Sequence, residues 1–243
     1  MSERREPRMV WVRDLWTIRL HWFNAVCWAL LVASGLAVIS GDSLRLAPAF
    51  WASFVQNLVG GNAVVITGHG LVGLAWVIGI ALFVLVRWRG VVKPFLRGVL
   101  SLTPGRVLND LRFTVVTLAR LFGLMKQVEL EPQGRYNGAQ RLLGTMIILA
   151  SVVIAVSGLY LFFAPKLFSF AASPLFGALF RTALVVHAAA VFLVLIGLVA
   201  HIYFAVVEER ESLEGMKSGY ASVEFIHHHN PLWYEQLKRE GKI

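Results

Sequence analysis

Cysteine and charge are both scarce in this chain of 243 residues. Cys27 is the one cysteine, and charged residues make up 15% of the sequence against 57% hydrophobic residues. A single thiol cannot form an intramolecular disulfide, ligate an iron–sulfur cluster or provide the CxxCH attachment of a c-type haem. Any redox centre in this chain therefore needs ligands other than cysteine.

Charged side chains are absent from four long segments of the sequence. The mean hydropathy of +0.67 is too high for a soluble domain of this length. Each segment exceeds the roughly 20 residues that a helix needs to cross a bilayer, and the first is too long for a signal peptide. The sequence predicts an all-α integral membrane protein, a four-helix bundle whose first span is retained. The four segments are Leu20–Gly41, Ala63–Val86, Leu142–Pro165 and Thr182–Val207.

The net charge of +9 is distributed unevenly between the two sides of the predicted spans. All but three of the 23 Lys and Arg residues lie in 1–19, 87–141 and 208–243. Positive residues accumulate on the cytoplasmic side of a membrane protein, so this pattern favours membrane topology over nucleic-acid binding. The sequence predicts a multi-pass membrane protein with both termini cytoplasmic.

The same pattern divides the chain into three parts. We expect a cytoplasmic segment over 1–19, a transmembrane domain over 20–207 and a cytoplasmic tail over 208–243. Residues Val107–Leu121 have apolar side chains at helical spacing with arginines among them, which predicts a helix on the membrane surface. Residues Asp42–Asn62 are expected to form a loop.

Histidine occurs in the predicted spans, whereas Asp, Glu, Lys and Arg do not. His187 and His201 stand fourteen positions apart, which puts both rings on one helix face and separates them by about 21 Å. Ionisable groups at membrane depth are costly and usually functional.

Two further histidines complete two pairs at two depths. With the predicted orientation, His21 lies with His201 near the cytoplasmic face, and His69 lies with His187 near the outer face. Two imidazoles from different helices are what a six-coordinate haem b requires, since its iron takes one axial ligand from each side. A zinc or di-iron site would want its ligands at one place, often with carboxylates, and Asp and Glu are absent from the four segments. Histidines that merely bond to a neighbouring helix are the other alternative, and two haems are favoured over it.

Glycine spacing adds a weaker prediction. Gly35 follows His21 by fourteen positions, and Gly144 and Gly158 are again fourteen apart. Glycines at these places would leave room for a porphyrin edge beside the histidines, although glycine is common in transmembrane helices. Candidate partners for haem propionates are Arg13, Arg19, Arg141, Arg45, Lys166 and Arg181.

The motifs along the chain resemble those of a known family. The chain is similar to the cytochrome b (gamma) subunit of respiratory formate dehydrogenase, within the four-helix cytochromes b that also serve nickel–iron hydrogenases and thiosulfate reductases. The matching pieces are Arg19-Leu-His-Trp22, Leu31-Val-Ala-Ser-Gly35, Gly68-His-Gly70, Arg135-Tyr-Asn-Gly-Ala-Gln-Arg141, Val186-His-Ala-Ala-Ala190, Ala200-His-Ile-Tyr203, Ser212-Leu-Glu-Gly-Met216, Gly219-Tyr220 and His228-His-Asn-Pro-Leu-Trp-Tyr234.

The resemblance implies ligands and a quinone site. It assigns the haem ligands to His21, His69, His187 and His201, and it implies quinone reduction (menaquinone or ubiquinone) near the inner haem. The quinone residues would be Asn137, Gly138, Ala139 and Gln140. The family often has Asn-Ala-Gly-Gln where this chain has Asn-Gly-Ala-Gln, so Asn137 and Gln140 rank above the two residues between them.

The resemblance also implies partners and a function. An iron–sulfur (beta) subunit and a molybdenum or tungsten catalytic (alpha) subunit would deliver electrons from formate, and this chain would relay them through two haem b groups to quinone. The chain would have no formate-oxidising site of its own, and a higher oligomer of the complex is a further expectation. The alternatives are a cytochrome b serving a hydrogenase or a sulfur-compound reductase, or a haem-free membrane anchor or transporter.

Overall fold

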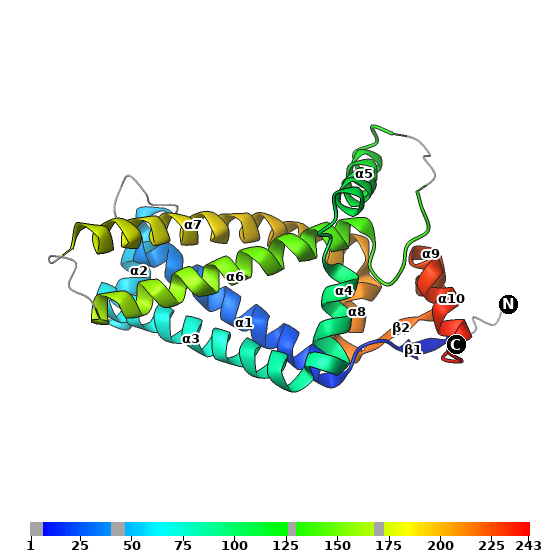
Figure 1. The fold of residues 1–243 in the computed structure, drawn as a ribbon, viewed down its shortest axis with the longest axis horizontal. Coiled ribbons are helices and arrows are strands. Elements are labelled where there is room, and N and C mark those ends of the chain that lie inside the picture. The colour runs from blue at the N-terminus through cyan, green and yellow to red at the C-terminus, as the bar shows by residue number, and fades with distance from the viewer. Residues whose placement is uncertain (1–6, 40–46, 126–129, 168–172) are drawn as a thin grey trace. The chain divides into compact units, whose positions relative to one another are not determined.

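The computed structural model describes residues 7–39, 47–125, 130–167 and 173–243. Within these ranges, four helices are long and apolar enough to cross a membrane (Figure 1). The predicted all-α membrane bundle with four spanning helices is therefore confirmed, with helix ends that differ from the predicted spans by several residues. The four helices are α1 (Leu15–Val38), α3 (Asn62–Arg87), α6 (Gly138–Leu167) and α7 (Pro174–Tyr203).

Helix α1 begins earlier than the charge-free segment because Asp14 caps it. The Oδ1 atom of Asp14 accepts the backbone N–H of Trp16 at 3.1 Å and that of Thr17 at 3.3 Å. These bonds satisfy two of the orphan donors of the first turn. Asp14 also pairs with Arg87 at 3.2 Å, so the start of α1 is fixed to the end of α3.

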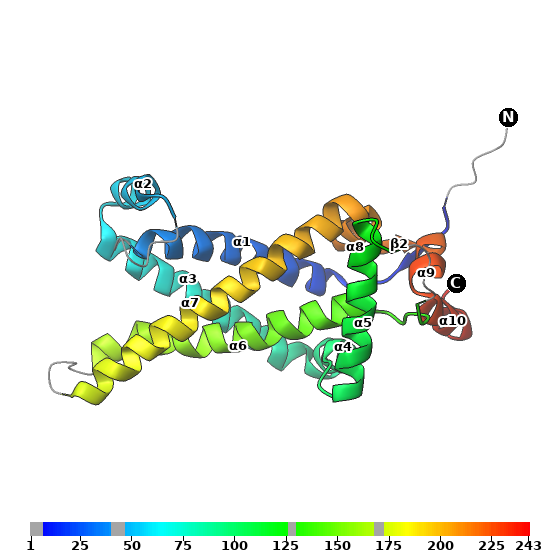
Figure 2. The ribbon, with the colours of Figure 1, turned by 90° about the horizontal axis from the view of Figure 1, so that it is seen from above.

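The predicted loop between the first two spans contains a helix. Helix α2 (Ala49–Val59) is apolar at helical spacing and lies beside the end of α1 (Figure 2). Trp51 Nε1 donates to the carbonyl of Ala33 at 3.0 Å, and Gln56 Nε2 donates to the carbonyl of Ala37 at 3.1 Å. The loop prediction is thus wrong for Ala49–Val59, because two side chains of this segment donate to carbonyls near the end of α1 and hold a short helix there. Helix α2 ends in a turn, where Gly60 and Gly61 take φ values of 95° and 117°.

The chain divides into two compact units. The terminal unit comprises Met1–Ile18, Arg87–Ala150 and Phe192–Ile243, and the span unit comprises Arg19–Val86 and Ser151–Val191. The boundaries between these units fall inside the long helices, so they do not test the predicted division of the chain. That division, into 1–19, 20–207 and 208–243, concerns membrane topology and stays a prediction.

The two ends of the chain pack together within the terminal unit (Figure 1). Strand β1 (Met9–Trp11) pairs antiparallel with β2 (Tyr220–Ser222), with Val10 opposite Ala221. Val10 and Ala221 bury against Ile226 and Leu237, which come from the two short helices after β2. The tail is therefore a folded structure. Its elements are η3 (Phe204–Glu208, a π-helical turn), α8 (Arg210–Ser218), α9 (Val223–His229) and α10 (Pro231–Arg239).

The long basic segment after α3 is also helical. A π-helical turn, η1 (Trp88–Val92), leads into α4 (Lys93–Val99), and α5 follows over Pro104–Leu121. The predicted helix over Val107–Leu121 is confirmed. One face of α5 is buried through Asp110 and Val116, and the other exposes apolar side chains. This exposed stripe suits the predicted position on the membrane surface, which stays a prediction. It consists of Leu108, Leu111, Val115 and Leu118.

Candidate functional site

His69 of α3 and His187 of α7 meet inside the span unit. Their ring centres are 6.4 Å apart and their planes are inclined at 77°. The structure thus brings together the two histidines that the sequence assigns to the outer level, whereas their role as ligands remains a prediction. Among the described residues there is no cluster of three or more His, Cys, Asp or Glu that could hold a metal ion.

A serine of the neighbouring helix holds each ring. The Oγ atom of Ser34 in α1 lies 2.9 Å from Nδ1 of His69, and Oγ of Ser157 in α6 lies 3.0 Å from Nδ1 of His187. The two histidines therefore have the same kind of partner, at the same ring nitrogen, from two different helices.

The other hydrogen bonds of the two serines show which atom, Oγ or Nδ1, carries the proton between them. Ser34 Oγ donates to the carbonyl of Leu30 at 2.7 Å, and Ser157 Oγ donates to the carbonyl of Val153 at 2.6 Å. A hydroxyl has one hydrogen, so each Oγ can only accept from the histidine. Nδ1 then carries the proton, and Nε2 keeps the lone pair that can ligate a metal.

The predicted glycine gaps are filled by the histidine rings. A Cβ atom built on Gly35 would lie 3.2 Å from Cε1 of His69, and one built on Gly158 would lie 3.1 Å from Cε1 of His187. These glycines therefore let the imidazoles reach the helix backbone, which differs from the predicted room for a porphyrin edge.

The other predicted gap also has an occupant. A Cβ atom on Gly144 of α6 would meet Cγ1 of Val99 at 2.5 Å, so α4 packs directly onto the backbone of α6 there. The prediction that Gly144 leaves room for a cofactor is wrong for this reason.

The sequence interpretation gave these serines no role, although Ser34 lies in one of the pieces that match the family. Residues 34–36 and 157–159 both have the sequence Ser-Gly-Leu, and each copy precedes the histidine that it contacts. This repeat is a signal that could have identified Ser34 and Ser157.

His21 and His201 are each described within their own units. His21 lies in α1 of the span unit and packs edge-on against Trp22 at 5.5 Å. His201 lies near the end of α7 in the terminal unit. Their pairing at the inner level stays a prediction.

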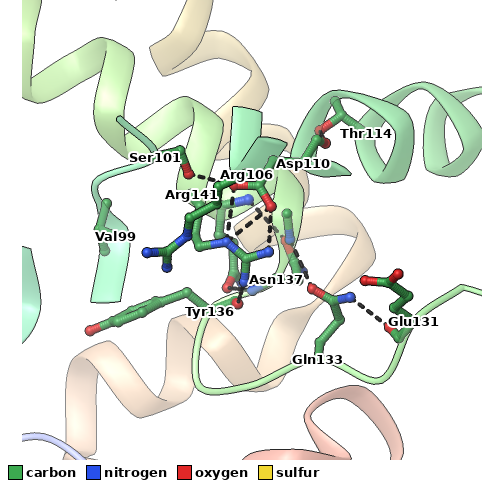
Figure 3. A network of polar contacts seen from close by, with 12 residues as sticks. Val99, Ser101, Arg106, Asp110, Thr114, Glu131, Gln133, Tyr136, Asn137 and Arg141 are labelled. Atoms are coloured by element: carbon green, nitrogen blue, oxygen red, sulfur yellow. Dashed lines mark hydrogen bonds and ion pairs between the residues drawn. The ribbon is translucent and has the colours of Figure 1, made fainter. Parts of the chain in front are cut away.

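A second polar centre surrounds Asp110 in the terminal unit (Figure 3). This carboxylate is 1% exposed and accepts hydrogen bonds from Ser101 Oγ and from Nε and Nη2 of Arg141. Arg141 Nη1 also donates to the backbone carbonyl of Tyr136. Thr145 joins the centre by accepting the backbone N–H of Ser101 at 3.0 Å. The network fixes α5 and the loop after α4 to the first turn of α6.

The charge of Asp110 is stabilised by these contacts. Burial alone would raise the pKa of this carboxyl, but the hydrogen bonds from Arg141 and Ser101 and the positive charges of Arg141 and Arg106 outweigh it. The pKa of Asp110 is therefore below its usual value, and the group is ionised at neutral pH.

The predicted quinone residues form the start of α6. The backbone N–H of Gln140 donates to Oδ1 of Asn137 at 2.9 Å, and the backbone N–H of Asn137 donates to Oε1 of Gln140 at 3.1 Å. This reciprocal arrangement is a capping box. The N–H of Gly138 is used by Oε1 of Gln133 at 3.1 Å, and Gly138 packs against Phe113 of α5. Ala139 is half-buried in the same turn.

Two of the predicted propionate partners are engaged elsewhere. Arg141 is paired with Asp110, and the ammonium group of Lys166 lies 3.2 Å from the centre of the Phe162 ring. These contacts explain both residues within the fold. Arg45 lies outside the described residues.

Comparison with known proteins gives this arrangement a family. A model of the prokaryotic cytochrome b561 family matches residues 12–219. The chain is also similar to the formate dehydrogenase cytochrome b556 subunit of Haemophilus influenzae, with 22% identity over 218 residues, covering 89% of this chain and 78% of that protein. The family match contains all four membrane-span histidines and the capping box at the start of α6. The chain belongs to the prokaryotic cytochrome b561 family.

Proposed function

We propose that this chain is the di-haem cytochrome b subunit of a respiratory formate dehydrogenase complex. It would relay electrons from an iron–sulfur subunit, supplied by a molybdenum or tungsten catalytic subunit, to a membrane quinone. The family match and the name of the Haemophilus relative support this proposal. The His69–His187 pair is the observation that carries it.

The donor set of this pair fits haem b. Two metal–imidazole bonds of about 2 Å each would leave roughly 4 Å between the two Nε2 atoms. The observed 6.4 Å between ring centres matches that separation once half of each ring is added. Both rings also present the nitrogen lone pair that a ligand needs, because Nδ1 is the donor to Ser34 or Ser157. When bound, haem supplies one-electron redox chemistry that no side chain here has.

His21 and His201 are proposed to hold the second haem. Helix α7 continues without a break from Pro174 to Tyr203, so helical periodicity applies over the whole distance from His187 to His201. The two rings therefore leave one face of α7 about 21 Å apart along the helix. This spacing supports one haem site near each membrane surface.

The start of α6 is proposed as the quinone site. The capping box uses the side-chain oxygens of Asn137 and Gln140, which leaves their amide NH2 groups as the donors that could reach a quinone carbonyl. The Asp110–Arg141 pair would hold this turn in place. Menaquinone and ubiquinone present the same carbonyl chemistry to these donors.

The remaining parts of the proposal concern topology and assembly. Positive charge in 1–19, 87–141 and 208–243 supports cytoplasmic termini, so the His69–His187 site would face a periplasmic electron donor. Electron input outside and proton uptake inside would charge the membrane.

The test is a redox difference spectrum of the complex with haem quantified per chain. We expect two haem b groups per chain, one of them lost in His69→Ala and the other in His201→Ala. His228→Ala, at an exposed histidine outside the spans, is the control and should retain both. A chain without haem would contradict the proposal. A nickel–iron partner in place of one with formate activity would favour the hydrogenase alternative.

A further inference from the structure

The two histidines that meet in the span unit are held by two copies of one local structure. In α1, Ser34 bonds to His69 and Gly35 lies under its ring; in α6, Ser157 and Gly158 do the same for His187. We propose that Ser34 and Ser157 are positioning residues that set the orientation and electron-donor strength of these imidazoles, and through them the redox potential of the haem. This inference rests on the proposed function.

Each copy supplies a serine Oγ as the acceptor for its histidine, at 2.9 Å from Nδ1 of His69 and 3.0 Å from Nδ1 of His187. The hydrogen of each hydroxyl is directed to backbone carbonyls of its own helix. Ser34 donates to Leu30 and lies 3.4 Å from the carbonyl of Leu31, and Ser157 donates to Val153 and lies 3.3 Å from the carbonyl of Ile154. The imidazole is therefore the donor to each serine.

The serine hydroxyls are not explained by helix geometry alone. A serine in a membrane helix can satisfy its hydroxyl by donating to the carbonyl four residues earlier, as Ser34 does with Leu30 and Ser157 with Val153. That bond leaves the oxygen lone pairs unused. In both copies a lone pair is aimed at the same nitrogen of a histidine from a different helix.

Glycine at the next position makes the contact possible. The Cβ positions of Gly35 and Gly158 lie 3.2 and 3.1 Å from the Cε1 atoms of the two rings. These are tighter than ordinary van der Waals contacts, so a larger residue would push the imidazole away from the serine. The Ser-Gly pair therefore fixes both the proton and the rotation of the ring.

The consequence for a bound iron has a definite sign. An N–H group that donates to an oxygen makes the opposite nitrogen a stronger electron donor. A stronger donor stabilises the oxidised iron more than the reduced iron and lowers the midpoint potential. Removing either hydroxyl should raise the potential of the haem held by His69 and His187, while the haem of the other pair keeps its potential.

The experiment is a redox titration of the intact complex carrying Ser34→Ala, Ser157→Ala or both. Each single change should shift the reduction equilibrium of one haem by up to about tenfold, about 59 mV for a one-electron couple. Affinity for that haem should fall by about 10–100-fold. The double variant should show both shifts added. The control is Ser151→Ala on α6, outside both Ser-Gly pairs, and it should change neither haem.

Threonine variants separate a hydrogen bond from packing. Ser34→Thr and Ser157→Thr keep the hydroxyl, so they should keep the haem and its potential where the alanine variants lose either. The inference is overturned if the alanine variants retain both potentials, if both haems shift equally, or if the threonine variants lose the haem as alanine does. A wild-type complex without haem b would instead contradict the proposed function.

Discussion

The histidine pair of the span unit and the carboxylate of the terminal unit are both polar groups in an apolar chain, but their partners differ. His69 and His187 bond to neutral serine hydroxyls. Asp110 is buried and bonds to the guanidinium group of Arg141, whose side chain is 17% exposed. The histidines therefore have neutral hydrogen-bond partners, whereas Asp110 has a positively charged one.

This difference distinguishes a site that can bind a ligand, the histidine pair, from a site that stabilises the fold, Asp110. A neutral imidazole that donates through Nδ1 still has an unused lone pair on Nε2, so a metal can be added without breaking a bond. Both oxygens of Asp110 accept hydrogen bonds from Arg141, and one of them also accepts from Ser101. We therefore expect changes at Asp110 to affect stability first, and changes around the histidines to affect the cofactor first.

The largest effect on stability is expected from Asp110→Ala. It would leave the largely buried Arg141 side chain, which is 17% exposed, without its counter-charge, at a cost of about 3–5 kcal/mol in the free energy of unfolding. Denaturant or thermal unfolding of the complex in detergent measures this. A cost below about 1 kcal/mol would show that Arg141 finds water or another partner, and would remove the contrast between the two sites.

A smaller effect is expected from Gly158→Ala. The added methyl group would lie 3.1 Å from Cε1 of His187, and the displacement of the ring should cost about 1–3 kcal/mol. The matched control is Gly73→Ala in α3, where the new Cβ meets Leu31 at 3.8 Å, an ordinary contact. If both variants unfold alike, the ring is not confined by the glycine.

A pH effect should appear at Asp110 and is expected to be smaller, since protonation leaves Ser101 and Arg141 in place. Because the pKa of this group is lowered in the folded chain, its stabilisation is complete above the ordinary value of 3.8 and is lost as pH falls through the folded-state pKa. Unfolding of wild type and Asp110→Asn, followed from about pH 6 into the acid range, should converge as the carboxyl protonates. Parallel curves would contradict this.

The smallest effect is expected at the half-exposed ion pair of Asp14 and Arg87. Exposed pairs contribute about 0.2–1 kcal/mol, so Arg87→Gln should cost no more than that. Asp14→Ala should cost about 1 kcal/mol more, because Asp14 also caps α1 through Trp16 and Thr17. Equal losses in the two variants would show that the cap contributes nothing.

Much of the fold follows from the sequence because membrane spans are long and uncharged. The segments Leu20–Gly41 and Ala63–Val86 fall inside or close to helices α1 and α3 for this reason. Helix α2 was missed, since the hydrogen bonds that hold it go to carbonyls of α1, and no local sequence pattern displays such contacts. The β1–β2 pairing was missed too, because its strands are three residues long and lie at opposite ends of the chain.

The site was predictable in part. The meeting of His69 with His187 follows from depth, which helix length and loop charge determine. The roles of Gly35 and Gly158 were misjudged because spacing shows where a gap lies and does not show which side chain enters it. The Asp110–Arg141 pair joins two helices through a long connection, so only the tertiary structure brings these charges together.

The pairing of β1 with β2 has a consequence for how the chain can be threaded. Backbone hydrogen bonds join residues 9–11 to residues 220–222, so these two stretches must occupy the same aqueous compartment. A polypeptide that leaves one side and comes back to it makes an even number of passages. The four apolar helices between the strands satisfy this parity, and a chain that lost or gained one passage could not close the ribbon.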